Sequence, residues 1–330
     1  MKHHLTCIMF GTILILAYFV FTVNLYVYAS DAPYIAFSSK QSGNYDIYIM
    51  DINGKNLQNL TNSPTHESKP TFSPDGHRMA YVSSRHDGYS EIYVMNLNTK
   101  VSHPLTNHPK HDDNPAWSPD GRWIAFDSNR EGSYHIYKIQ PDGENLQQLT
   151  HGVVDGNYAA WSPDSQSIAF DSFREAPGIY IMDADGGNQR RLPNQPQRGR
   201  MPSWSPDGKQ IAFSDTMLGG HRDPLLGGGQ DIYTLNVDGS SLRKRTRHPA
   251  NDLAPDWSPD GRSIVYYSEW NQKTDIYLIE GGLGRHAGRL TRHPADDKYP
   301  TWVPNGFFPV SPTMEIQTTL WGRLKQPAHD

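Results

Sequence analysis

Short apolar runs recur along this chain, each bounded by polar residues and turn formers. In one set the runs have Ala or Val at the centre and an aromatic residue next, and they cover residues 34–37, 79–82, 124–126, 168–170, 211–213 and 264–266. A second set is built around Ile-Tyr and covers residues 46–50, 91–95, 135–137, 178–182, 231–233 and 275–279. The runs are continuously apolar, whereas a sheet with one solvated face would alternate, so they predict β-strands that are buried on both faces.

A longer motif repeats in phase with these strands. An aromatic residue precedes a Ser-Pro-Asp-Gly turn or a close variant of it, at Phe72, Trp117, Trp161, Trp204, Trp257 and Trp302. The aromatic positions are 45, 44, 43, 53 and 45 residues apart, near the period of about 40–45 residues of a four-stranded propeller blade. Since Pro, Asp and Gly suit successive positions of a tight turn, each motif predicts a hairpin. The sequence therefore predicts an all-β fold, a six-bladed β-propeller of four-stranded blades.

The two ends of the repeat array complement each other. A weaker strand that ends in Leu-Thr precedes several motifs, at Leu60, Leu105, Leu149 and Leu290. The strand at 34–37 has no aromatic motif before it, and the segment 299–302 has no complete blade after it. We expect the carboxyl-terminal strand to complete the first blade as its innermost strand, which closes the ring and leaves no open sheet edge.

The first 29 residues have a different composition. Lys2 precedes an apolar stretch from Leu5 to Val23, and small residues lead up to Ala29. This pattern predicts a secretory signal that is cleaved after Ala29. An uncleaved membrane anchor is the alternative, because the stretch approaches the roughly 20 residues that span a bilayer. The expected organisation is thus a signal or anchor at 1–29, a propeller at 30–306 and a tail at 307–330, in a periplasmic, secreted or membrane-anchored protein.

Charge and motifs narrow the classes of function. The formal net charge is −5, which gives no basic face for nucleic acid. The chain contains no Gly-x-Ser-x-Gly elbow and no His-Glu-x-x-His motif, and only 24 residues follow Gly306, too few for an attached hydrolase domain. We expect a monomer without a cofactor and without recognisable catalytic machinery.

The repeat consensus resembles a known family. Leu-Thr, an acidic loop, Pro-x-Trp-Ser-Pro-Asp-Gly, Ile-Ala-Phe and Asp-Ile-Tyr follow one another across residues 34–306, as in the WD-like propeller repeat of TolB-type proteins. The resemblance implies a periplasmic propeller that binds peptide segments of partner envelope proteins. It covers the propeller alone, and the α/β domain that precedes the propeller of TolB proper is expected to be absent.

Acidic residues recur five or six positions before the repeat aromatics. They are Glu67, Asp112, Asp155, Asp252 and Asp297, with Arg198 and Arg200 in the interval that breaks the pattern. Equivalent positions in a propeller lie at one radius, so we expect an acidic ring at one mouth of the central channel. Such a ring could bind a basic peptide or a cation such as calcium. The alternative is that these carboxylates accept hydrogen bonds from neighbouring loop groups and fix the spacing of the blades.

Histidines lie near the same loops. They are His66, His108, His111, His151, His248 and His293. Histidine with carboxylates is a common metal-ligand set, but a metal needs at least three donors that converge from different blades. We therefore expect surface histidines in these loops and predict no metal site.

Two segments depart from the repeat. The long interval before Trp257 contains a Gly-rich loop, 215–229, whose apolar residues Met217, Leu218, Leu225 and Leu226 could contact a partner. In the tail, Ile316, Leu320 and Leu324 have helical spacing, which predicts a short amphipathic helix.

These observations predict an exported, non-catalytic scaffold that binds an envelope protein or peptide through the acidic mouth or the long loop. The alternative is an enzyme, a lyase or hydrolase acting on a carbohydrate or small molecule, that uses scattered histidines and carboxylates in the channel.

Overall fold

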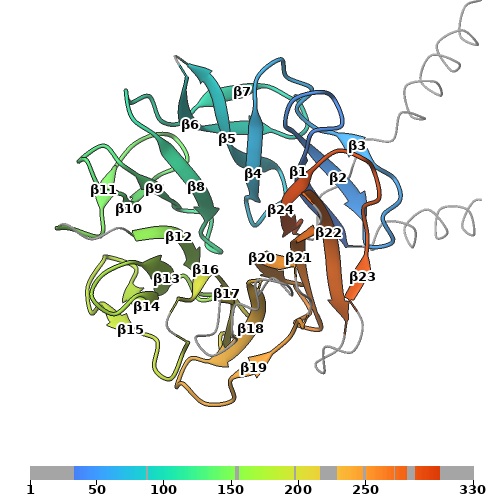
Figure 1. Cartoon of the computed structure of the whole chain (residues 1–330). Helices are drawn as coiled ribbons and strands as arrows, with labels where there is room; N and C mark the ends of the chain where they lie inside the picture. The colour runs from blue at the N-terminus through green and yellow to red at the C-terminus, as the bar shows by residue number, and fades with distance from the viewer. Residues whose placement is uncertain are drawn as a thin grey trace, which may run out of the picture. The chain divides into compact units, whose positions relative to one another are not determined.

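The computed structural model describes residues 33–86, 88–152, 156–196, 198–215, 229–247, 250–270, 272–280 and 287–304. Their strands form six antiparallel four-stranded sheets arranged as blades around a central channel, as predicted (Figure 1). None of these residues belongs to a helix that could cross a membrane. The first blade is β24-β1-β2-β3, and the second to sixth blades are β4–β7, β8–β11, β12–β15, β16–β19 and β20–β23.

Each blade runs from an innermost strand at the channel to a short outermost strand. The innermost strands are β24 (Asp297–Trp302), β4 (Glu67–Phe72), β8 (Asp112–Trp117), β12 (Gly156–Trp161), β16 (Arg200–Trp204) and β20 (Asn251–Trp257). The second strands are β1 (Tyr34–Ser39), β5 (Arg78–His86), β9 (Ile124–Ser128), β13 (Ser167–Ser172), β17 (Gln210–Asp215) and β21 (Ser263–Trp270). The third strands are β2 (Asp46–Asp51), β6 (Tyr89–Asn96), β10 (His135–Ile139), β14 (Gly178–Asp183), β18 (Asp231–Asn236) and β22 (Lys273–Glu280). The outermost strands are β3 (Gln58–Asn59), β7 (Ser102–Pro104), β11 (Gln147–Gln148), β15 (Arg190–Arg191), β19 (Arg243–Lys244) and β23 (Ala287–Arg289).

The ring closes through the first blade. Strand β24 pairs antiparallel with β1, from Ile35 opposite Trp302 to Ser39 opposite Asp297. The remaining strands of this blade, β1 to β3, come from the other end of the described chain (Figure 1). The predicted closure by a carboxyl-terminal strand is confirmed.

The hydrophobic core lies between the blades. Second and third strands are buried over most of their length, as their continuously apolar sequences predict. Between the second and third blades, for example, Val82 and Leu105 pack with Trp117, Phe126 and neighbouring apolar residues in one cluster. Each blade therefore buries both faces against its two neighbours.

The repeated turn fixes the hairpin between the first and second strands. In the second blade the Gly76 N–H donates to the Ser73 carbonyl, and the Ser73 hydroxyl donates to the Asp75 carboxylate at 2.5 Å. The Arg78 N–H in turn donates to the Ser73 hydroxyl at 2.9 Å. The fourth blade has Ser165 in place of the repeat glycine, and this residue keeps the same positive φ of 59°.

The repeat tryptophans join adjacent blades at their inner ends. The indole Nε1–H donates to a backbone carbonyl of the preceding blade from Trp161 to Ala116, from Trp204 to Ala160 and from Trp302 to Asp256, each at 3.1 Å. In the part of the chain that is described, the Nε1 of Trp257 is buried without an acceptor. The indole hydrogen bond therefore joins adjacent blades at three junctions. It is absent from the described part of the junction of the fifth and sixth blades.

This difference predicts unequal effects of one substitution. Trp302→Phe removes a buried hydrogen bond, so the free energy of unfolding should fall by about 1 kcal/mol beyond the loss of ring volume. Trp257→Phe removes a similar volume and an N–H that has no acceptor, so its loss should be smaller. Urea unfolding of both variants measures the difference. Equal losses would show that the indole bond does not hold the blades together.

Candidate functional site

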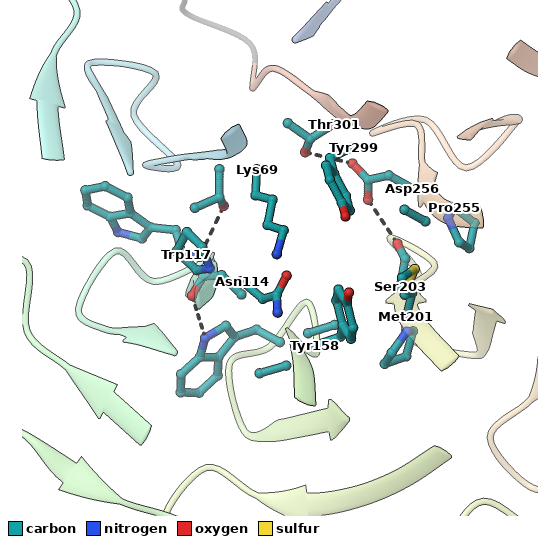
Figure 2. Close-up of a pocket in the computed structure, with 18 of the residues that line it drawn as sticks. Lys69, Asn114, Trp117, Tyr158, Met201, Ser203, Pro255, Asp256, Tyr299 and Thr301 are labelled. Atoms are coloured by element: carbon teal, nitrogen blue, oxygen red, sulfur yellow. Dashed lines mark hydrogen bonds between the residues drawn. The ribbon is translucent and has the colours of Figure 1, made fainter. Parts of the chain in front are cut away.

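A cavity of about 280 Å³ lies in the central channel (Figure 2). Its wall is formed by three consecutive positions of every innermost strand. We call the residues at the first of these positions the channel ring: Lys69, Asn114, Tyr158, Met201, Ala254 and Tyr299. The second position is proline in five blades and Ala159 in the fourth. The third position carries Thr71, Ala116, Ala160, Ser203, Asp256 and Thr301.

Every residue of the channel ring lies on a β-bulge. The six φ angles are positive, between 49° and 55°, and pairing with the second strand shifts its register at each of these sites. A non-glycine residue in this left-handed region costs about 1 kcal/mol or more, so the surrounding structure must hold it there. The bulge interrupts the alternation of the strand beside the cavity.

Groups of the preceding blade hold two of the bulges. The backbone N–H of Lys69 donates to the Ser38 hydroxyl at 3.0 Å, and that of Tyr158 donates to Asp127 Oδ1 at 3.1 Å. Ser38 and Asp127 occupy the same position, directly after the aromatic residue of a second strand. The wall of the channel is thus fixed in position before any ligand binds.

Lys69 places an ammonium group among aromatic rings of the channel. Its Nζ lies 5.1 Å from the ring centre of Tyr299 and 5.8 Å from that of Tyr158, and it contacts Asp113 Oδ1 at 2.7 Å. Figure 2 shows the side chain extending into the channel toward Asn114. Burial lowers the pKa of Lys69, but the Asp113 carboxylate together with Tyr158 and Tyr299 outweighs burial, so the net shift is upward. The group therefore stays charged at neutral pH.

Asp127 is a buried carboxyl behind this wall. Burial, and then the charge of Asp113, raise its pKa well above the usual range, against the opposing effect of Lys69. The Asn114 amide donates to both carboxylate oxygens, at 2.8 and 3.1 Å. Asp127 thereby fixes the orientation of one residue of the channel ring and the backbone of the next, Tyr158.

Asp256 joins three blades at another point of the wall. Its carboxylate accepts hydrogen bonds from Ser203 Oγ at 3.0 Å and Thr301 Oγ1 at 2.9 Å (Figure 2). It also accepts one from the Trp302 N–H at 3.0 Å. Burial raises the pKa of Asp256 against these three donors. Because both oxygens are engaged, we assign this carboxylate to holding the ring together.

The acids expected at the channel mouth lie inside the blades. Glu67 is buried and accepts hydrogen bonds from Thr65 Oγ1 at 2.8 Å and Arg85 Nε at 3.1 Å. Asp112 is buried and accepts both of its bonds from Arg130, at 2.9 and 3.0 Å. These contacts are of the kind that fixes blade geometry, the alternative considered from the sequence.

Two of the remaining predicted acids are also buried, and one is not described. Asp252 and Asp297 are buried, and burial raises the pKa of Asp297. None of the four described acids lines the cavity, whose wall begins two positions further along each strand. Asp155 lies outside the described residues. A role of these five residues in binding stays a prediction.

Three of the described loop histidines make local contacts, whereas His108 has a buried Nδ1 without a partner in the described residues. The Nδ1 atoms of His66 and His111 accept the backbone N–H groups of Tyr45 and Ser90, at 3.3 and 3.2 Å, across the junction with the preceding blade. His293 Nδ1 accepts the Ala295 N–H at 3.1 Å. Within the described residues, no group of three His, Cys, Asp or Glu side chains could hold a metal ion. His248 lies outside the described residues, and the bound cation stays a prediction.

Several predicted features fall outside the described residues. These are the signal or anchor, the loop residues Met217, Leu218, Leu225 and Leu226, and the helix of the tail. The division of the chain into these parts stays a prediction.

Sequence reasoning missed the channel ring. The signal was present in the motif x-Pro-x-aromatic, in which proline and the aromatic residue repeat while the residue before proline differs in every blade that has it. A position that varies between repeats while its neighbours stay constant is not restricted by the packing that restricts those neighbours. This variation could have marked Lys69, Asn114, Met201, Ala254 and Tyr299.

Comparisons with known proteins agree with this architecture. The sequence matches the family model of the TolB beta propeller domain over residues 28–159 and 160–311. It is 47 % identical over 45 residues to the Tol-Pal system protein TolB of Geobacter sulfurreducens, and 35 % identical over 58 residues to a protein TolB homolog of Chlorobium luteolum. These alignments cover 14 % and 18 % of this chain, but only 10 % and 13 % of the relatives' own length.

Solved structures share the fold at low sequence identity. TolB from Acinetobacter baumannii has a TM-score of 0.72 at 22 % identity, over 83 % of this chain and 67 % of that chain. A putative TolB from Agrobacterium tumefaciens has a TM-score of 0.64 at 22 % identity, over 84 % of this chain and 99 % of that chain. A chain of a nidogen/laminin complex has a TM-score of 0.66 at 12 % identity, over 82 % of this chain and 98 % of that chain. The six-bladed ring is thus common to proteins with very different sequences.

The buried carboxyl of Asp171 predicts a pH dependence of stability. Burial raises its pKa to about 7, against the effect of Arg200, whose Nε lies 3.2 Å away. An aspartate in an unfolded chain has a pKa of about 3.9, so the folded state holds the proton more tightly. The contribution of this group to stability is present below about pH 4 and is lost as the pH rises toward 7, at up to about 1.4 kcal/mol per pH unit.

Asp171→Asn should therefore flatten the decline of unfolding free energy between about pH 4 and 7. Urea melts across this range measure the slope. Asp142→Asn is the control, because Asp142 is exposed in a turn and its replacement should leave the slope unchanged. Parallel curves for Asp171→Asn and the parent protein would contradict the assignment.

Proposed function

The chain belongs to the TolB beta propeller domain family, and from this premise we propose that it is an envelope scaffold that captures an extended segment of another protein in its central channel. The relatives' names refer to TolB and the Tol-Pal system, which supports a role in the cell envelope and a location in the periplasm. The observation that carries the proposal is the channel ring, a set of differing side chains on six equivalent and rigidly held bulges.

The size of the cavity favours an extended segment. Its volume of about 280 Å³ is near the lower limit of roughly 300 Å³ for small-molecule sites. It admits a few side chains, not a folded domain. The rings of Tyr158 and Tyr299 and the thioether of Met201 offer apolar contact, while Asn114 and Lys69 offer hydrogen-bond donors.

The charge of the wall favours an acidic residue in the segment. Lys69 carries the only ammonium group among the residues that line the described channel. An ammonium has three N–H donors, and the contact with Asp113 uses one of them. A carboxylate of the ligand can accept another. This proposal replaces the basic peptide that the acidic positions suggested, because Glu67 and Asp112 pair within their blades and none of the four described acids lines the cavity.

The test compares binding of extended peptides to variants of the channel ring. In fluorescence polarisation, the parent protein should select acidic over basic members of a peptide library. Lys69→Met removes a charged hydrogen bond and should weaken acidic peptides by about 10- to 100-fold. Asp113→Asn should strengthen them, because it leaves the ammonium without its competing carboxylate. Lys209→Met is the control, since Lys209 is exposed on a turn outside the channel.

Two results would overturn the proposal. One is equal affinity of the parent protein and Lys69→Met for every peptide that binds. The other is turnover of an oligosaccharide library by a protein that binds no peptide, which would favour the enzymatic alternative. Circular dichroism of each variant verifies that a lost affinity does not come from unfolding.

A further inference from the structure

The junction between the fifth and sixth blades departs from the repeat at one core position. Five blades place a leucine directly after the outermost strand, where it packs between the blades: Leu60, Leu105, Leu149, Leu192 and Leu290. The fifth blade has Arg245 instead. The backbone is unchanged, because the Arg245 N–H donates to the Ile232 carbonyl at 2.7 Å, just as the Leu105 N–H donates to that of Ile92 at 2.7 Å. Only the side chain differs.

This exchange leaves a crevice where the other junctions are filled. At the junction of the third and fourth blades the equivalent leucine, Leu149, packs with the repeat Trp161. Between the fifth and sixth blades, Arg245 and Trp257 instead line a cavity of about 240 Å³, with Ile264 and Ile279 among its apolar lining residues. We call this cavity the interblade crevice. It shares no lining residue with the channel cavity, so its function is independent of the one proposed for the channel.

Three arginines are among the residues that line the interblade crevice: Arg243, Arg245 and Arg262. Arg245 donates through Nε to the Thr234 hydroxyl at 2.8 Å, and burial together with the charge of Arg243 lowers its pKa. No carboxylate of the described residues lies within 4.0 Å of Arg243. Arg262 has only Asp260, at 4.0 Å and with both side chains exposed, a contact of little energy. Positive charge is therefore concentrated here on a chain whose formal net charge is −5.

We propose that the interblade crevice binds a phosphate group. Guanidinium groups present paired N–H donors that match the oxygens of phosphate, and they are less strongly hydrated than an ammonium. The two negative charges of phosphate offset the mutual repulsion of the arginines better than one carboxylate would. The volume accommodates a phosphate with a small substituent, and the Ser263 residue and the Gln210 amide complete the polar lining.

The repeat supplies a direct test, because five blades show which residue fills the position. Arg245→Leu restores the leucine, so it should fold and fill the crevice. Thermal unfolding of the parent protein in inorganic phosphate, against chloride at equal ionic strength, should show a rise in Tm of about 2 °C at tenfold excess over the Kd. Arg245→Leu should lose this rise entirely. Arg243→Gln and Arg262→Gln should each weaken phosphate by about tenfold.

Arg122→Gln is the matched control. Arg122 follows the same turn in the third blade, is exposed and faces Asp120 at 3.9 Å, as Arg262 faces Asp260. Its replacement should leave phosphate binding unchanged. The proposal is overturned if phosphate gives no more stabilisation than chloride, or if Arg245→Leu responds as the parent protein does.

Two further ligands identify the source of the phosphate. Glycerol 3-phosphate tests a soluble ester, and vesicles of phosphatidylglycerol test a lipid headgroup by flotation. Flotation that Arg245→Leu abolishes assigns the headgroup. Stabilisation by the soluble phosphates without flotation assigns a free phosphate or a small ester. Isothermal titration of inorganic phosphate into both proteins verifies the Kd without relying on stability.

Discussion

The ring depends on how each blade is fastened to the one before it at the channel. Adjacent innermost strands share no ladder of hydrogen bonds, so single contacts between them have to set their spacing. The indole bonds of Trp161, Trp204 and Trp302 are three such contacts, and the carboxylate of Asp256 joins three blades at once. Because a closed ring has to satisfy all six junctions together, a change in spacing at one of them would strain the others.

The repeated residues that build the blades are different from the residues of the channel ring. Proline, the aromatic residue and the Ser-Pro-Asp turn repeat because each has a structural role in every blade. The channel ring lies on β-bulges, and its side chains differ from Lys69 to Ala254 without any change in φ beyond a few degrees. Such a frame can present many ligand-binding surfaces, since a substitution in the channel ring leaves the contacts that build the blades intact.

The fold could be predicted from the sequence because its determinants are local and repeated. The aromatic motif, the apolar runs and the unmatched ends of the array together predicted six blades and their closure, and the structure confirms them. The candidate site could be predicted only in part. The recurring acids were visible, but the sequence does not tell whether a side chain such as Glu67 faces the channel or pairs with Arg85 inside its own blade.

That distinction depends on the bulge, which shifts the strand register and so changes which residues face the channel. The contacts of Lys69 also join residues from four blades, Asp113, Tyr158 and Tyr299 with Lys69 itself, and no spacing along the chain encodes them. Arg245 is the opposite case. The sequence repeat shows that Arg245 replaces a leucine. The consequence of this replacement is seen only in the structure, as the cavity between two blades.

The pairing of β24 with β1 also sets the order in which the molecule can fold. Blades two to six each consist of consecutive strands and can form from local contacts, whereas the first blade needs strands from both ends of the array. Contacts between residues so far apart in sequence are slow to form. Until β24 arrives, the inner edge of β1 exposes unpaired backbone groups, which is the state most open to pairing with another chain. A newly made molecule is therefore most exposed to aggregation, and most in need of a chaperone, just before the ring closes.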